Sequence, residues 1–300
     1  MTDSTPLISV VTVNFNGHDL TCAMISSLRR HVTVPLEIIV VDNGSKADEA
    51  AMIRAEWPDV KAIRSEVNLG FAGGNNLGIR EAAGRYVLLL NNDTEVKDDT
   101  LGRLCSALDA DPRAGVVCPK IRFFQEPCQI QFAGYTPLSR ITLRNSLIGF
   151  GREDDGSFDR PSETPYAHGA AMMVRREALE EAGPMPEEFF LYYEELDWSL
   201  RFREKGWKIL YEPSCAIFHK ESATTGQRSP LRTYYLTRNR MLFARRNLPG
   251  RDRILSILYQ TLVSLPKSVA VSLASGRGDL AGAALKGAWD FYHGKDGKGI

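Results

Sequence analysis

Two apolar, β-rich runs near the N-terminus constrain the fold more than any other feature. They span Leu7 to Val13 and Leu36 to Asp42, and each ends in polar or glycine-rich residues. Between them, apolar residues from Leu20 to Leu28 recur at helical spacing, with Asp19 near the expected helix start. A strand, a helix and a second strand of these lengths form a βαβ unit, which is typical of a parallel sheet. We therefore predict an α/β fold.

The same alternation continues beyond these two strands. The segment 68–78 holds four glycines, and we interpret it as a loop that allows close backbone approach before a helix that ends near Gly84. The other elements expected in this half are a helix over about residues 47–57, strands over 60–64 and 86–90, and an amphipathic helix carrying Leu101, Leu104 and Leu108.

Polar side chains follow four of the predicted strands. In open α/β sheets, ligands bind beyond the carboxyl ends of the strands. We therefore expect one site, assembled from separate loops at one edge of the sheet. The four residues at these strand ends are Asn14, Asp42, Arg64 and Asp93.

The segment Asn91, Asn92 and Asp93 closes the most apolar of these strands. One carboxylate beside two neutral amides suits a hard divalent cation that shares its oxygen ligands with phosphates. The alternative is that these residues only turn the chain and cap a helix that begins near Asp98.

Several other classes of protein are disfavoured. The first strand-to-helix turn, Asn14 to Gly17, lacks the G-x-G-x-x-G fingerprint of a Rossmann dehydrogenase, and the chain has no P-loop. The five cysteines are scattered without close pairs, so neither a zinc knuckle nor a disulfide framework is supported. No signal-like segment opens the chain, and we expect a reduced cytoplasmic location.

The neutral total charge hides an asymmetry. Residues 220–300 carry 14 Lys and Arg against 5 Asp and Glu, a net charge of +9, which leaves −9 on residues 1–219. Basic segments often meet phosphate, on nucleic acid or on anionic lipid. No nucleic-acid recognition motif accompanies this segment, so we expect no nucleic-acid partner.

Seven short motifs, in this order and spacing, carry a resemblance to a known family. They are Val11-Thr-Val-Asn-Phe-Asn-Gly17, Val41-Asp-Asn-Gly-Ser45, Asn68-Leu-Gly-Phe-Ala-Gly-Gly-Asn-Asn76, Leu89-Leu-Asn-Asn-Asp-Thr94, His168-Gly-Ala-Ala-Met-Met-Val-Arg175, Tyr193-Glu-Glu-Leu-Asp-Trp198 and Tyr234-Tyr-Leu-Thr-Arg-Asn239. Over roughly residues 7 to 245, the chain resembles the inverting nucleotide-sugar glycosyltransferases of family 2, and within them the bacterial rhamnosyltransferase-like branch.

The resemblance implies a nucleotide-binding fold of GT-A type. Residues 1–228 would form this domain, with a donor-binding half over 1–120 and an acceptor and catalytic half over 121–228. Residues 229–300 would form a basic amphipathic helical extension. The resemblance also implies donor-binding roles, with Asp42 on the N3–H of a pyrimidine base, for Val13, Asn14, Asp42, Asn43, Gly70, Asn75, Asn76, Asn91, Asn92 and Arg228.

The resemblance further implies a metal site. Asp93 would bind Mg²⁺ or Mn²⁺ that bridges the donor diphosphate, at the last position of a D-x-D-like element whose first carboxylate is here Asn91. His219 would be a second protein ligand. Arg228 and Arg232 lie in a loop that could close over the diphosphate.

A general base is implied in the second half of the chain. Glu195 holds the place of the family's usual Asp, and would take the proton of the attacking sugar hydroxyl. Glu194, Asp197 and Gly169 would support it, with Asp197 four residues before Arg201 on one helix. Without the other motifs, the acidic residues would only be a solvated first helical turn.

The implied reaction is transfer of a sugar, with inversion, to a hydroxyl of a glycan or lipid-linked acceptor in bacterial cell-surface polysaccharide synthesis. The branch points to dTDP-L-rhamnose as donor, with a UDP-hexose or another deoxysugar nucleotide as the alternative. A further alternative is a nucleotide-sugar-binding module that has lost catalysis, given Asn91 and Glu195.

Residues 229–300 are expected to be helical and basic. Gln260, Pro266 and Lys267 are expected to interrupt the apolar run before it reaches the ~20 residues of a membrane span. The helices could lie on a bilayer, which would make the protein peripheral on the inner face of the cell membrane. They could instead pack on the catalytic domain or form a homodimer.

Overall fold

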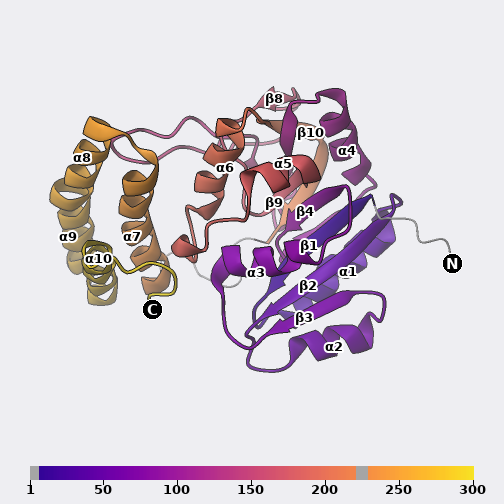
Figure 1. Ribbon diagram of the computed structural model, residues 1–300, viewed down its shortest axis with the longest axis horizontal. Helices are drawn as coiled ribbons and strands as arrows, with labels where there is room; N and C mark the ends of the chain where they lie inside the picture. The colour runs from indigo at the N-terminus through magenta and orange to yellow at the C-terminus, as the bar shows by residue number, and fades with distance from the viewer. Residues whose placement is uncertain (1–6, 221–228) are drawn as a thin grey trace.

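A mostly parallel sheet forms the centre of the computed structural model, which describes residues 7–220 and 229–300 (Figure 1). The strand order is β3-β2-β1-β4-β9-β6-β10-β5, with β7 beside β6 and β8 beside β10. The strands are β1 (Ile8–Asn14), β2 (Leu36–Asn43), β3 (Lys61–Ser65), β4 (Tyr86–Leu90), β5 (Thr94–Glu95), β6 (Ala114–Phe123), β7 (Ile130–Phe132), β8 (Ser162–Glu163), β9 (Ala171–Arg175) and β10 (Lys208–His219).

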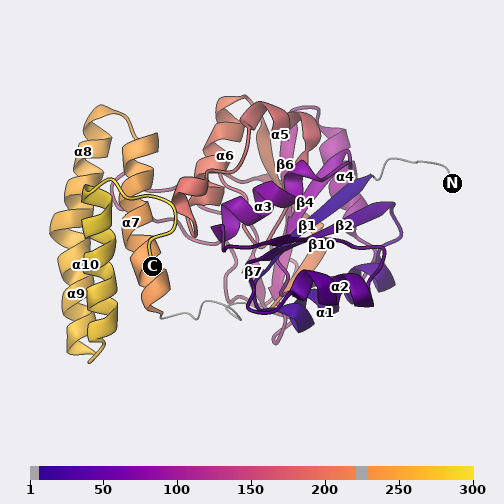
Figure 2. The ribbon, with the colours of Figure 1, turned by 60° about the horizontal axis from the view of Figure 1, so that its bottom comes forward.

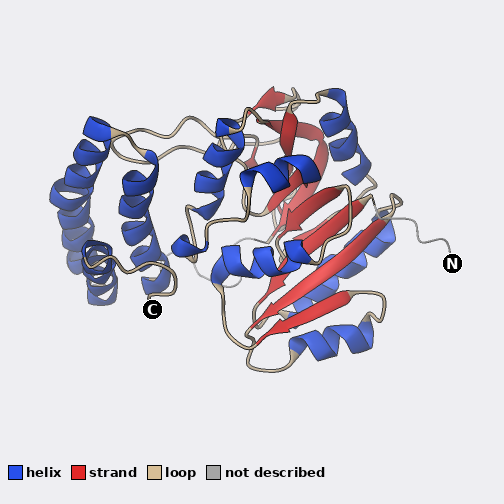
Figure 3. Cartoon of the chain, in the orientation of Figure 1, coloured by secondary structure: helices blue, strands red, loops and turns tan. Residues whose placement is uncertain are grey.

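Helices cover both faces of the sheet and extend beyond it at one side (Figure 3). The helices are α1 (His18–His31), α2 (Glu49–Glu56), α3 (Gly70–Arg80), α4 (Leu101–Ala110), α5 (Arg176–Ala182), the short 3₁₀ turn η1 (Glu187–Phe189), α6 (Glu194–Glu204), α7 (Pro230–Asn247), α8 (Gly250–Tyr259), the π-helical turn η2 (Gln260–Ser264), α9 (Leu265–Ala274) and α10 (Gly278–Tyr292). The predicted α/β fold is confirmed.

The chain order creates a crevice between β1 and β4. The chain runs from β1 to β2 to β3 in one direction, and then returns to place β4 on the other side of β1. With right-handed crossovers, α3 therefore lies on the opposite face from α1 and α2. Ligands of open α/β sheets bind at such a switch point, beyond the carboxyl ends of the two strands. Asn14 and Asn91 stand at these ends.

The second half of the sheet restores the same polarity. β9 is antiparallel to both β4 and β6, and β6 is parallel to β10. β10 therefore runs in the same direction as β4, and both strands end at one edge of the sheet. This arrangement brings His219, the last residue of β10, to the edge where Asp93 follows β4.

The glycine-rich segment is a helix, and our prediction of a loop there was wrong. α3 begins at Gly70, and two of its glycines, Gly74 and Gly78, face β1. A Cβ added at Gly78 would lie 2.4 Å from Cγ1 of Val11, and one added at Gly74 would lie 2.9 Å from Cγ1 of Val13. The glycines therefore let the helix pack unusually close to β1, which outweighs their poor helix propensity.

The structure also moves two expected boundaries. After Asp93, the chain forms the short strand β5, and the next helix begins only at Leu101. Asp93 therefore does not cap a helix, and the alternative that residues 91–93 only cap one was wrong. The sequence of residues 168–174 is typical of a strand entered through Gly169, but β9 begins only at Ala171, because Gly169 and Ala170 form a turn before it.

The C-terminal helices form a layer at the side of the sheet furthest from the N-terminus (Figure 2). α8, η2 and α9 form one continuous helix, Gly250–Ala274, which is long and apolar enough to cross a membrane by length and composition. Our expectation that Gln260, Pro266 and Lys267 interrupt it was wrong. The π-helical turn η2 directly precedes Pro266, and such a turn accommodates a residue that has no N–H to donate.

Candidate active site

Asp93 and His219 lie side by side at the carboxyl edge of the sheet. β5 brings them together, because Thr94 pairs with His219 in the antiparallel ladder. Nε2 of His219 is 3.1 Å from Oδ1 of Asp93, and both side chains are almost fully buried. Asp93 and His219, which lie far apart in the sequence, are therefore neighbours in the structure.

The two ring nitrogens of His219 have different partners. Nδ1 lies 2.8 Å from the amide oxygen of Gln131. An amide oxygen only accepts, so Nδ1 donates the hydrogen bond to Gln131, and Nε2 faces the carboxylate of Asp93. An imidazole nitrogen and a carboxylate oxygen, with the ring fixed by a second hydrogen bond, are suitable ligands for a divalent metal.

Aromatic rings connect this pair to Glu195. The ring of His168 stacks on Tyr135 with centroids 5.9 Å apart. Burial and the neighbouring His219 lower the pKa of His168 to about 3, so this ring is neutral. Burial raises the pKa of the Tyr135 hydroxyl well above its usual value, and the charge of Glu195 adds to this shift. His168 is therefore a neighbour of His219, and Tyr135 is a neighbour of both His168 and Glu195.

Two adjacent carboxyl groups begin α6, and burial raises the pKa of both. The pKa of Glu195 is raised to about 7. The pKa of Glu194 is raised well above its usual value, by burial and by the charge of Glu195. The Glu194 side chain is buried, whereas Glu195 is partly exposed. Glu195 is therefore the carboxyl group of the two that substrate can reach and that changes charge near neutral pH.

A strained turn presents both carboxyl groups. Phe190, Tyr192 and Tyr193 adopt left-handed backbone conformations, with φ values of 64°, 69° and 79°. Each such conformation costs a residue other than glycine about 1–2 kcal/mol. Three of them within four residues persist only if the surrounding structure holds the backbone in place.

Arg238 and Asn239 of α7 hold this turn. The side-chain amide of Asn239 lies 2.9 Å from the carbonyl oxygen of Phe189, 2.7 Å from that of Leu191 and 2.9 Å from that of Tyr192. The guanidinium of Arg238 donates to the Phe189 carbonyl at 2.8 Å. Both side chains are fully buried. α7 therefore supports the segment that positions Glu195.

Asp197 fastens the same two helices rather than facing the site. Its carboxylate accepts hydrogen bonds from Arg246 at 3.0 Å and from Asn247 at 2.9 Å, both near the end of α7. The pairing with Arg201 expected from their spacing is present at 3.6 Å. Two arginines of α7, Arg238 and Arg246, thus bond to the segment 189–197.

On the donor side, Asn14 and Asn92 are joined across the switch point. The hydroxyl of Thr21 donates to the side-chain oxygen of Asn14 at 2.7 Å and accepts from the amide of Asn92 at 3.0 Å. The amide of Asn14 also donates to Glu49 at 2.7 Å. These bonds fix the loops that follow β1 and β4, and they leave Asn91 half-exposed beside them.

Asp42 is fully buried at the end of β2. One of its oxygens accepts from the backbone N–H of Ser45 at 3.2 Å. The other accepts from the backbone N–H of Ala50 at 3.3 Å and from Arg64 at 3.2 Å. These bonds shape the loop that follows β2, and contact with a base stays a prediction for this residue.

The remaining predicted donor residues hold backbone in place. Asn43 accepts from the N–H of Leu69 and donates to the carbonyl of Gly70, which fixes the start of α3. Asn75 donates within α3, to Phe71. Asn76 exchanges hydrogen bonds with the backbone of Met185 and so ties the donor half to the acceptor half. Val13 is the penultimate residue of β1, Gly169 lies in the turn before β9, and Arg228 lies outside the described residues.

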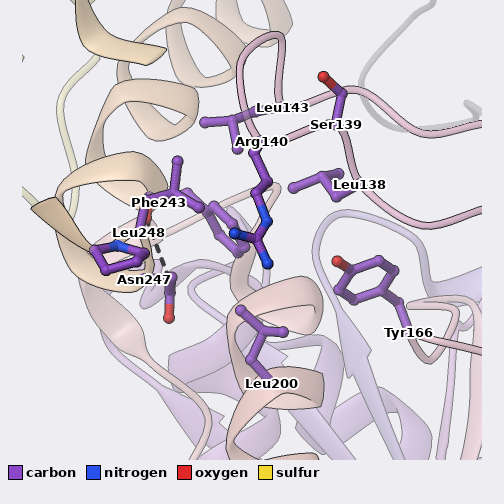
Figure 4. A pocket seen from close by; sticks show the side chains of 10 residues that line it. Leu138, Ser139, Arg140, Leu143, Tyr166, Leu200, Phe243, Asn247 and Leu248 are labelled. Atoms are coloured by element: carbon purple, nitrogen blue, oxygen red, sulfur yellow. Dashed lines mark hydrogen bonds between the residues drawn. The ribbon is translucent and has the colours of Figure 1, made fainter. Parts of the chain in front are cut away.

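A cavity of about 240 Å³ lies elsewhere, where the loop after β7 meets α6 and α7 (Figure 4). Its lining is mostly apolar and includes Leu143, Leu200 and Phe243. None of the predicted site residues lines it, so we do not assign it to the donor.

The model of glycosyl transferase family 2 matches residues 9–183, more than half of the chain. The chain belongs to this family. Among curated relatives, it is 27% identical over 245 residues to the N-acetylglucosaminyl-diphospho-decaprenol L-rhamnosyltransferase of Mycobacterium tuberculosis, covering 74% of this chain and 79% of the relative. It is 28% identical over 243 residues to the low-salt glycan biosynthesis hexosyltransferase Agl10 of Haloferax volcanii, covering 78% of this chain and 74% of the relative.

A dTDP-rhamnosyl transferase of Shigella flexneri, RfbF, is 25% identical over 242 residues, covering 75% of this chain and 78% of the relative. Among solved structures, the mannosyltransferase PcManGT of Pyrobaculum calidifontis, in complex with GDP-Man and Mn²⁺, matches with a TM-score of 0.60 at 19% identity. The match covers 96% of this chain and 88% of that one. The glycosyltransferase fold of GT-A type is confirmed.

The roles of several residues that build the site of this family 2 enzyme could not be identified from the sequence. Gln131 and Tyr135 lie in a segment without regular periodicity, so nothing in the pattern singles them out. Arg238 and Asn239 do lie in a recognised motif. Their function became visible only when the turn they hold was seen.

We expect Asn239→Ala to weaken the turn and to reduce turnover. The change leaves the carbonyl groups of Leu191 and Tyr192 without this donor, whereas Arg238 still donates to that of Phe189, and the loss costs about 1–3 kcal/mol of unfolding free energy. Urea unfolding and release of nucleoside diphosphate from a donor sugar test this. Thr237→Ala is the matched control, because that hydroxyl bonds only within α7 in the described structure. Unchanged turnover in Asn239→Ala would contradict the positioning role.

Proposed function

We propose that this family 2 glycosyltransferase transfers L-rhamnose from dTDP-L-rhamnose, with inversion, to a hydroxyl of a glycan or lipid-linked acceptor in cell-surface polysaccharide synthesis. Two of the relatives described above are named as rhamnosyl transferases, and one of these names includes a lipid diphosphate acceptor. A UDP-hexose or another deoxysugar nucleotide is the second candidate donor, supported by the hexosyltransferase relative. A thermal-shift screen of nucleotide sugars separates them, because a ligand of the native state raises its stability.

One observation carries the reaction chemistry: Glu195 is a partly exposed carboxyl group in the first turn of α6, and its pKa of about 7 suits a general base. In the proposed step, the carboxylate of Glu195 takes the proton of the acceptor hydroxyl as the oxygen bonds to the anomeric carbon. The bond from that carbon to the diphosphate oxygen breaks on the opposite side. Configuration inverts, and no covalent intermediate with the enzyme forms.

The residues of the switch point would hold the donor. The open β1 and β4 ends would receive the diphosphate, beside half-exposed Asn91. Asp93 and His219 would hold Mg²⁺ or Mn²⁺, whose positive charge would stabilise the leaving diphosphate. The donor set of this pair, one carboxylate oxygen and one imidazole nitrogen 3.1 Å apart, suits such an ion.

We expect Glu195→Gln to lower turnover by about 10²–10⁴-fold with donor binding nearly unchanged, since a general base contributes that much. In the wild type, kcat/KM should rise with pH and level off above about 7, where the carboxyl group loses its proton. This limb should vanish in Glu195→Gln and return in Glu195→Asp. Glu204→Gln, at the exposed end of α6, is the control. Full turnover in Glu195→Gln would exclude the base assignment. The alternative of a binding module without catalysis would be favoured only if the wild type itself showed no turnover.

We expect Asp93→Asn and His219→Ala each to weaken Mn²⁺ binding at least tenfold in the presence of dTDP. Each change removes one of two facing ligand atoms. Electron paramagnetic resonance of free Mn²⁺ measures the affinity without requiring activity. Asp98→Asn, an exposed carboxylate nearby in sequence, should bind as the wild type does. Equal affinity in all four proteins would rule out the metal site.

We further propose that the C-terminal helices lie on the inner face of the cell membrane. In the continuous helix α8–α9, two polar side chains face the protein, whereas the exposed side is apolar. Ser256 and Gln260 are buried and donate to the carbonyl groups of Ile141 and Thr142. The exposed side is apolar and includes Ile254, Leu255, Leu258, Leu262, Val263, Val271 and Leu273.

A bilayer suits this apolar side better than a second copy of the chain does. Lys267 is the single charged residue between Arg253 and Arg277, so basic residues flank the apolar stretch. Trp289 and Tyr292 are exposed on the neighbouring helix α10, and such rings favour the membrane interface. Because the polar side of α8–α9 already bonds the protein, the helix would lie in the interface rather than span it.

We expect the wild type to co-sediment with vesicles that contain anionic lipid. A double variant, Leu258→Glu with Leu262→Glu, should bind these vesicles about tenfold more weakly or worse. Met52→Glu, an exposed apolar residue on α2, is the control. Point variants are preferable to removal of residues 250–300, because α10 covers α7. Sedimentation velocity tests the alternative, that the apolar side of α8–α9 forms a homodimer. A wild-type dimer that does not bind vesicles, and that the double variant breaks, would overturn the proposal.

A further inference from the structure

Three side chains that can bind metal meet between α1 and α2, and none of them takes part in the proposed reaction. His18 and Cys22 are four residues apart on α1, so they share one face of that helix. Glu56, the last residue of α2, faces them. Figure 2 shows the two helices side by side.

The distances between the three ligand atoms match those around one small ion. Sγ of Cys22 is 3.5 Å from Nε2 of His18 and 3.5 Å from Oε2 of Glu56, and the last two atoms are 3.6 Å apart. In a tetrahedral zinc site, bond lengths of about 2.0–2.3 Å place the ligand atoms about 3.3–3.7 Å apart. The three atoms therefore form one face of such a tetrahedron.

Two neighbours prepare these atoms for a metal. The Nδ1 atom of His18 lies 3.1 Å from a carboxylate oxygen of Asp19. A carboxylate accepts the proton at Nδ1 and so leaves the Nε2 lone pair for the ion, which is the usual arrangement around metal-bound histidine. The indole N–H of Trp57 is buried without a hydrogen-bond partner among the described residues, and it lies near enough to Cys22 to favour the thiolate.

We propose that His18, Cys22 and Glu56 bind a thiophilic divalent ion of the zinc class. One thiolate and one carboxylate balance its two charges. A thiolate, an imidazole and a carboxylate favour zinc over Mg²⁺ or Ca²⁺, which prefer oxygen ligands alone. Glu56 and part of His18 are exposed, so water can fill the fourth position. The ion would join α1 to α2 next to the Asn14–Gly17 turn.

Binding must displace a proton from sulfur. Burial, with the nearby carboxylate of Glu56, raises the pKa of Cys22 to about 11. The apparent affinity for zinc should therefore increase with pH, because the ligand binds as the thiolate.

Titration with Co²⁺ tests the site directly. We expect one equivalent to produce a thiolate-to-cobalt charge-transfer band, which the oxygen and nitrogen ligands at Asp93 and His219 cannot give. Cys22→Ser should abolish the band, Glu56→Gln should weaken Co²⁺ binding at least tenfold, and Zn²⁺ should displace the cobalt. Cys128→Ser, which removes the exposed thiol, and Asp93→Asn should leave the band unchanged.

The wild type and the exposed Glu56→Gln variant keep the test decisive even if Cys22→Ser does not fold. Zn²⁺ should raise the thermal midpoint of the wild type, and should raise that of Glu56→Gln less. Absence of the charge-transfer band in the wild type, or its persistence in Cys22→Ser, would overturn the proposal. Loss of the band in Cys128→Ser would place the ion elsewhere and would overturn it as well.

Discussion

The left-handed turn from Phe190 to Tyr193 is the constraint on which the site depends. It connects η1, which packs against α3, to the first turn of α6, and so it determines the positions of Glu194 and Glu195. Its conformational cost is of order 1–2 kcal/mol for each non-glycine residue, and buried hydrogen bonds from Asn239 offset that cost. The helix that supplies them is remote in sequence but belongs to the same physical unit.

The rest of the site follows from the order of the strands. The reversal after β3 opens a crevice beyond β1 and β4, and the antiparallel β9 lets β10 end at the same edge. The strand ends of the donor-binding half and of the acceptor half therefore lie at one edge of the sheet, and no long loop is needed to bring them together. The same buried surroundings that raise the pKa of Glu195 keep His168 neutral, so one environment serves both groups.

Much of this architecture could be predicted from the sequence, since the apolar runs at β1, β2 and β4 have one obvious structure. The meeting of Asp93 with His219 was foreseen through a family resemblance and not through spacing. The helix at Gly70 was missed because local propensity favours a loop, whereas close packing against β1 decides the outcome. The hydrogen bonds that join Arg64 to Asp42 and Asn239 to Phe189 could not be predicted, because no sequence periodicity relates the segments that they join.

The segment from Gly297 to Gly299 links the outer helices to catalysis. Its backbone accepts from Arg238 at 2.7 Å, and the N–H of Gly297 donates to the carbonyl of Glu188 at 2.7 Å. The N–H of Gly299 donates to Tyr235 at 3.0 Å. This strap therefore contacts both η1, which directly precedes the strained turn, and α7, which holds that turn. The residues that follow α10 thus help to fix the backbone that leads to Glu195.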